Sequence, residues 1–154
     1  MVRTEVDVDV SGTLNWLERQ AQRIVRFPSV EVGWISPIAY PGRKDNATTV
    51  SVARKNISGH GNVPARDPLE EMERMYRKQI DRDAKQAFYS VLKMKNSLTT
   101  AVGLLSRNLR IYLWNAIHWG RYAPLSPRTI RRKGHSKPLI DSYLLANSIQ
   151  TRIK

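Results

Sequence analysis

The sequence predicts a single α+β domain, in which a small, mostly antiparallel sheet packs against two long α-helices and a long mobile loop projects from them. Short segments of alternating polar and apolar side chains indicate strands, and two long stretches with apolar residues at helical spacing indicate the helices. Clusters of proline and glycine separate these segments. A chain of 154 residues buries one modest core, so we expect one domain that spans residues 1–154.

The predicted strands are short and lie far apart in the chain. Residues 4–10 (TEVDVDV) alternate strictly, which is the period-two pattern of a strand with one buried face. Strands are also expected at 29–36, at 48–54, where threonine and valine dominate, and at 147–153. Apolar residues at helical spacing over 14–25 predict a helix between the first two strands.

Two long helices are predicted in the middle of the chain. Asp67 is placed to cap the first helix, Pro68 suits its first turn, and the apolar stripe then continues to Met94. The second helix is predicted over 98–119, and Gly120 can end it. Its apolar residues cover a wide arc, so we expect burial on most sides and a central place in the fold.

Two segments are rich in turn residues. Residues 37–66 contain several prolines, glycines and asparagines, and apart from the strand at 48–54 they predict a long flexible loop or docking arm. A second loop is expected over 121–138, where Ser126 followed by Pro127 predicts the start of one short helical turn. A last helix or turn is expected within 140–149.

The charge of the chain is large and unevenly distributed. The formal net charge is +13, and residues 1–83 hold 13 Lys/Arg and 12 Asp/Glu, a net charge of +1. Residues 84–154 hold 13 Lys/Arg and a single acid, Asp141, a net charge of +12. This half should attract polyanions or acidic protein surfaces. The alternative is a solvated basic surface that serves solubility.

Residues that could support catalysis or metal binding do not form a recognisable pattern. The sequence has no cysteine, and its three histidines lack a second ligand at metal spacing. The run Gly-His-Gly at 59–61 lacks the helix start and Lys-Ser/Thr of a phosphate-binding loop. We therefore expect no enzymatic activity and no cofactor; a metal-dependent nuclease would have to depend on His60 or His118.

Targeting and membrane segments are also not predicted. No apolar run approaches the ~18 residues that a membrane span needs, and the first residues lack the apolar core of a signal peptide. We therefore expect synthesis in the cytosol and neither secretion nor membrane insertion.

The basic residues in the two loops are the candidates for contact with a partner. The strongest run, Arg-Thr-Ile-Arg-Arg-Lys at 128–133, suits DNA phosphates or an acidic neighbour, and a solvated turn is an equal alternative. The predicted interface residues are Arg43, Lys44, Arg54, Lys55, Arg66, Arg128, Arg131, Arg132 and Lys133.

Several stretches together resemble a known family. Residues 120–134 (GRYAPLSPRTIRRKG) and 137–149 (KPLIDSYLLANSI) resemble the C-terminal signature of virion morphogenesis and tail-completion (neck) proteins of tailed bacteriophages. Residues 30–34 (VEVGW) are similar to an early strand of that family. The runs VARKN at 52–56 and GNVPAR at 61–66 look like the family element that leads into the long helix.

This resemblance implies a non-enzymatic structural protein of the virion, made and assembled in the cytoplasm of the host bacterium. It would complete the tail and join head to tail at the neck, as one subunit of a hexameric or dodecameric ring. The implied partners are the connector or head-completion proteins and the tail-tube or tail-terminator proteins, with non-specific contact to genomic DNA in the channel. The alternative is a basic nucleic-acid-binding protein in phage DNA packaging or head morphogenesis.

Overall fold

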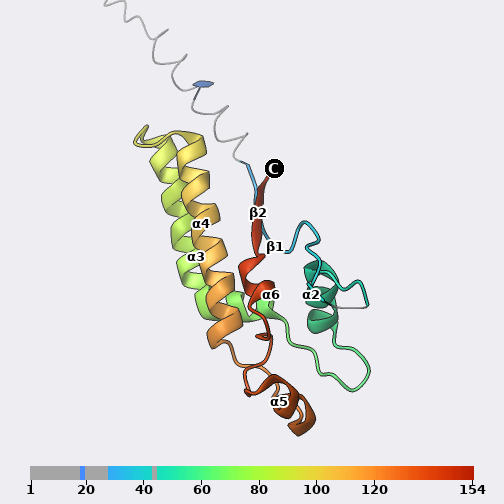
Figure 1. Ribbon diagram of the computed structural model, residues 1–154. Helices are drawn as coiled ribbons and strands as arrows, with labels where there is room; N and C mark the ends of the chain where they lie inside the picture. Colours follow the sequence, from blue (N-terminus) through green and yellow to red (C-terminus); the bar gives the residue numbers. More distant parts are fainter. Residues whose placement is uncertain (1–17, 20–27, 43–44) are drawn as a thin grey trace, which may run out of the picture.

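The fold is α+β, as predicted, with helices packed against a two-stranded antiparallel sheet (Figure 1). The computed structural model describes residues 18–19, 28–42 and 45–154. In chain order its elements are β1 (Val30–Gly33), α2 (Thr49–Ser58), α3 (Pro68–Leu92), α4 (Leu98–Trp119), α5 (Pro127–Lys133), α6 (Leu144–Asn147) and β2 (Gln150–Ile153).

The two long helices begin at the residues that the sequence predicts. The Asp67 carboxylate accepts hydrogen bonds from the backbone N–H groups of Leu69 and Glu70, so it caps α3. The Ser97 hydroxyl accepts from the N–H of Thr100 and caps α4 in the same way. These side chains satisfy N–H groups that have no partner within the first turn of a helix.

The ends of the helices also follow the sequence closely. α3 ends at Leu92, two residues before the predicted limit, and the chain then turns through Met94 with a positive φ of 54°. α4 ends at Trp119, where the N–H of Gly120 donates to the carbonyl oxygen of Ala116. The predicted pair of long helices is confirmed.

The short elements near the C-terminus are confirmed as well. The Ser126 hydroxyl accepts from the N–H of Thr129 at the start of α5, and Pro127 stands in its first turn. Gly134 ends α5 in the left-handed conformation, with a φ of 77°. One turn, α6, follows within the predicted 140–149 segment.

The sheet joins the chain near its described start to the C-terminus. β1 and β2 are antiparallel, with Val30 opposite Ile153. Val32 packs against the helices, and the indole N–H of Trp34 donates to the carbonyl oxygen of Leu145 in α6 at 2.7 Å. The strands predicted at 29–36 and 147–153 are therefore present.

The core surrounds α4, which lies between α3 and the sheet (Figure 1). Leu113, Ala116 and Ile117 are almost fully buried and pack with Met72 of α3 and Ile149 beside β2. This confirms the central place of α4. The expectation of burial on most sides is wrong for its outer face, where apolar side chains remain exposed.

The strand predicted at 48–54 is wrong, because these residues form the N-terminal part of α2. Thr48 and Ser51 make a capping box, in which the hydroxyl of each accepts from the backbone N–H of the other. This pair of hydrogen bonds starts a helix, although the segment is rich in residues that favour strands. Residues 37–66 are therefore not one long loop, and single β-bridges join Ala39 to Thr48 and His60 to Val63.

The predictions for the N-terminal part fall largely outside the described residues. The strand at 4–10 lies entirely outside them. Of the helix predicted over 14–25, only Glu18 and Arg19 are described, and both are helical. Within the described ranges, no helix combines the length and apolar character that crossing a bilayer requires.

Candidate functional site

A buried arginine connects the two loops that hold most of the predicted interface residues. Arg66 is only 5% exposed. Its Nε donates to the carbonyl oxygen of Ala123 and its Nη2 to that of Pro124, each at 2.8 Å, although these residues lie 57 and 58 positions later. The backbone N–H of Arg66 also donates to the carbonyl oxygen of Asn56 in α2. One residue, through its side chain and its backbone, thus holds α2, the start of α3 and the 120–126 turn together.

The charged group of Arg66 makes its contacts inside the protein. Burial lowers the pKa of its guanidinium, but arginine stays protonated in proteins at all ordinary pH values. The planar group has fork-like donors that suit two neighbouring carbonyl oxygens. Arg66 therefore shapes the predicted interface rather than presenting a charge to a partner.

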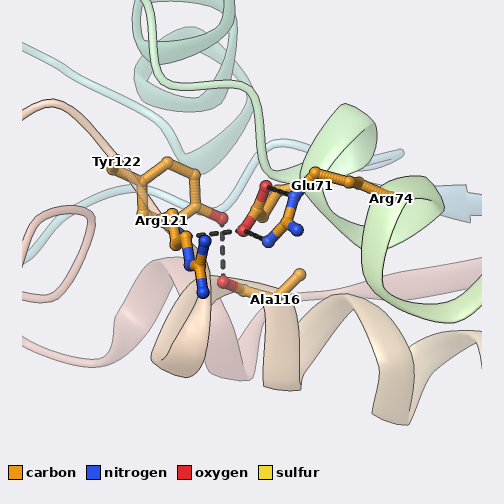
Figure 2. A network of polar contacts seen from close by, with 5 residues as sticks. All are labelled: Glu71, Arg74, Ala116, Arg121 and Tyr122. Carbon is orange, nitrogen blue, oxygen red and sulfur yellow. Dashed lines mark hydrogen bonds and ion pairs between the residues drawn. The ribbon is translucent and has the colours of Figure 1, made fainter.

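A second network fixes the chain as it leaves α4 (Figure 2). Glu71 of α3 is almost buried, and its Oε1 accepts from the backbone N–H of Arg121 at 2.6 Å. Arg74 binds both oxygens of the same carboxylate, at 2.7 and 2.6 Å. The hydroxyl of Tyr122 donates to the carbonyl oxygen of Ala116 at 2.8 Å. Glu71 therefore ties the start of α3 to the end of α4.

The pKa of Glu71 reflects this network. The hydrogen bond from Arg74 lowers the pKa of Glu71, burial opposes this, and the backbone hydrogen bond from Arg121 lowers it further. The net direction is downward, so the carboxylate is held in its charged form.

Gly120 stands where only a glycine fits. A Cβ atom at this position would lie 2.4 Å from the carbonyl oxygen of Ala116, 2.6 Å from Cγ of Glu71 and 2.7 Å from the hydroxyl oxygen of Tyr122. Its φ of −67° is open to any residue, so the requirement comes from close packing. The turn after α4 is thus rigidly placed, and with it the position of α5.

These contacts enclose a groove of about 560 Å³ with both polar and apolar lining, which we call the polar groove for the charged residues that it contains. It is lined by residues of α2, α5, the 62–66 and 124–126 turns and the 139–145 segment. Among the described lining residues the cations are Arg66, Arg132 and Lys133, and the acid is Asp141. The groove is therefore predominantly positive and can accept an acidic segment of a partner.

Lys133 is the half-buried cation of this groove. Its Nζ donates to the carbonyl oxygen of Lys137 at 3.1 Å. Burial lowers the pKa of Lys133, Asp141 opposes this, and Arg132 and Arg66 add to the lowering. The side chain is thus fixed at the edge of the groove.

The other predicted interface residues are spread over several surfaces. Arg128 and Arg131 are exposed on α5. Arg54 and Lys55 are exposed on α2, and Arg54 borders a different hollow beside β1. Arg43 and Lys44 lie outside the described residues. The structure therefore brings Arg66, Arg132 and Lys133 together but leaves the α2 pair apart from them.

The outer face of α4 is a surface that the sequence reasoning missed. Leu104, Arg107, Ile111 and Trp114 follow one another at helical spacing on this face, and the three apolar side chains are 50%, 43% and 37% exposed. Arg107, Ile111 and Trp114 border a hollow of about 280 Å³ together with Arg110. Tryptophan and arginine are enriched in the energetically important part of protein interfaces. Arg107 and Arg110 interrupt the apolar arc of α4, and this is the feature of the sequence that indicates an exposed face. We call this surface the α4 stripe.

An aromatic stack continues the α4 stripe toward α6. The rings of Trp114 and His118 stack with centroids 3.6 Å apart, and Tyr143 lies 5.8 Å beyond His118. Nδ1 of His118 lies 2.8 Å from the carbonyl oxygen of Trp114. Among the described residues, no three His, Asp or Glu side chains gather as metal ligands do.

Comparisons of the chain with protein-family models, with curated proteins and with solved structures find no match.

Proposed function

We propose that this chain is a structural protein of a tailed-phage virion, which completes the tail and joins it to the head at the neck. It acts as a subunit of a hexameric or dodecameric ring and has no enzymatic activity. It is assembled into the virion in the cytoplasm of the host bacterium. Its partners are the connector or head-completion proteins on one side and the tail-tube or tail-terminator proteins on the other.

The hydrogen bonds of Arg66 carry this proposal. Arg66 ends the run GNVPAR, and its acceptors Ala123 and Pro124 lie in the run GRYAPLSP. Both runs belong to the stretches that resemble the neck family. The two runs are distant in the sequence but contact each other, which supports a joint structural role for them. Their contact also shapes the polar groove, which gives the shared residues a role in docking.

The α4 stripe supports a role in assembly. Monomeric proteins rarely leave a row of large apolar side chains on an outer helix face. A closed ring needs contacts in which one face of a subunit meets a different face of the next copy. The α4 stripe is suited to such a contact, and the polar groove to an acidic segment of a neighbouring virion protein.

A phage that lacks the gene for this chain provides the test. We expect electron micrographs of the lysate to show heads filled with DNA beside complete, unjoined tails. Expression of the chain from a plasmid should restore joined particles. Normal, infectious virions in the absence of the chain would refute the proposal, and an absence of heads would place the chain in head maturation instead.

A second candidate is a nucleic-acid-binding protein of DNA packaging or head morphogenesis. The observation that favours it is the net charge of +12 over residues 84–154. It predicts that particles of the same deletion phage stall with empty heads. The presence or absence of DNA in the heads therefore separates the two candidates.

A further inference from the structure

We infer that the end of the molecule formed by α5 and its flanking loops binds the phosphate backbone of double-stranded DNA. This inference rests on the proposed function, because DNA passes through the neck of a phage. Residues 119–140, which we call the basic end, contain six Lys/Arg and neither Asp nor Glu. The six are Arg121, Arg128, Arg131, Arg132, Lys133 and Lys137.

The cations of the basic end are available to a ligand. Arg128, Arg131 and Arg132 are exposed, and none of them makes an ion pair within the described part of the chain. By contrast, Arg74 and Arg77 of α3 are paired with glutamates of the same helix. Six cations without an acid within residues 119–140 therefore give this end a strong positive field.

The placement of α5 leaves the basic end open to a large ligand. α5 lies beyond the C-terminal end of α4, at one end of the molecule and away from the sheet (Figure 1). None of its residues is buried. The three exposed arginines span four residue steps, which is about 6 Å along a helix axis. Successive phosphates of one DNA strand advance by about 3.4 Å, so this group can reach two or three of them.

Lys137 extends the same surface. Its Nζ lies 5.3 Å from the centre of the Trp119 ring, and this ring is 66% exposed. A cation over an aromatic face is held there by the charge distribution of the ring. Lys137 thus adds a further cation to the basic end, on the side nearest α4.

The chemistry of the surface favours nucleic acid over an acidic protein. A protein interface has an apolar centre with a polar rim. Within the basic end, Trp119 is the one large hydrophobic side chain that is strongly exposed, and Lys137 lies over its ring. The exposed side chains of α5 are instead three arginines and Pro127. Contacts to phosphates need no apolar centre and carry no sequence information.

The test measures binding of the full chain to a fluorescent duplex of about 30 base pairs over a range of salt concentrations, with the number of contacts taken from the slope. The test variant is R128E/R131E/R132E. The matched control is K78E/R82E/K85E, which makes the same charge change on the exposed side of α3. Thermal unfolding of both variants shows whether the fold is kept.

We expect the α5 variant to lose at least about tenfold in affinity and its salt slope to fall by about 2 to 3, because each phosphate contact adds about 0.9. The control should lose affinity only slightly and keep its slope. Equal losses in both variants, or no binding at low salt, would overturn the inference. So would competition by polyglutamate as strong as that by unlabelled duplex, since an acidic protein surface would then suffice.

The binding assay and the deletion phage together distinguish a failure of this inference from a failure of the proposed function. If the deletion phage stalls as unjoined heads and tails but the chain does not bind DNA, only the proposed role of the basic end is refuted, and the neck function stands. Normal virions in the deletion phage would refute the neck function, whatever the binding assay gives.

Discussion

Arg66 donates a hydrogen bond from Nε to the carbonyl oxygen of Ala123 at 2.8 Å, across 57 positions of the chain. The second hydrogen bond, to Pro124, uses the other arm of the same planar group. A buried cation that binds only backbone carbonyls fixes the path of two loops at once. The groove and the turn that leads into α5 are therefore shaped by internal contacts.

Replacement of Arg66 by lysine should destabilise the fold while the charge is kept. Lysine lacks the planar pair of donors, so at least one of the two carbonyls loses its partner. We expect the free energy of unfolding to fall by about 2 kcal/mol. Urea denaturation measures this, and R54K on the exposed side of α2 is the control. Equal stability of the two variants would contradict a structural role for Arg66.

Glu71 should make the stability depend on pH in the acid range. Its pKa is lowered in the folded protein, so its stabilisation is complete above the unfolded value of about 4.3. This stabilisation is lost as the pH falls through the folded pKa. Between pH 5 and pH 3, wild-type protein should lose more stability than E71Q does. Chemical denaturation at several pH values measures the difference.

The exposed neighbour Glu70 provides the comparison, since E70Q should keep the wild-type pH dependence. An E71Q curve parallel to that of wild type over this pH range would mean that Glu71 is not held by Arg74 and Arg121.

Two glycines of the α4 region should respond to alanine in opposite directions. G120A places a Cβ 2.4 Å from the carbonyl oxygen of Ala116, and such overpacking costs about 1–3 kcal/mol. Gly103 lies within α4 with open space around it. G103A should therefore stabilise the protein by about 0.5–1 kcal/mol through helix propensity. Thermal unfolding compares the two, and destabilisation of both variants to the same extent would contradict the packing described for Gly120.

The α4 stripe should govern self-association. I111E places a charge at the centre of the stripe, and a charge that must be buried without a partner weakens an interface strongly. We expect sedimentation velocity to show oligomers of the wild-type chain that I111E dissociates into monomers. Y89E, at an exposed site of α3, is the control. If the I111E variant still forms oligomers and the Y89E variant does not, the subunit contact lies at the tip of the α3–α4 hairpin and not on the α4 stripe.

The parts of the fold that the sequence predicts correctly depend on local chemistry. Asp67 and Ser126 each cap a helix through hydrogen bonds within three residues, so the local sequence suffices to identify them. At 48–54 two local signals compete. Threonine and valine favour a strand, whereas the capping box of Thr48 and Ser51 favours a helix. The folded chain forms the helix.

The candidate site could be predicted only in part, because its central contacts are distant in sequence. The arginines of α5 were recognised from composition alone. The contact of Glu71 with the backbone of Arg121 could not be predicted, because the two residues lie 50 positions apart and nothing near Glu71 indicates it. The wide apolar arc of α4 predicts burial on most sides, but Leu104 and Ile111 are exposed, because periodicity alone does not distinguish a buried apolar face from an exposed one.

Complementation in vitro tests the central proposal most directly. Purified chain is added to a lysate of the deletion phage, which contains separate heads and tails, and infectious particles are counted. We predict that infectivity rises with added protein and that micrographs show heads joined to tails. Infectivity that stays unchanged at every concentration of folded protein, with heads and tails still separate, would contradict a role in joining them.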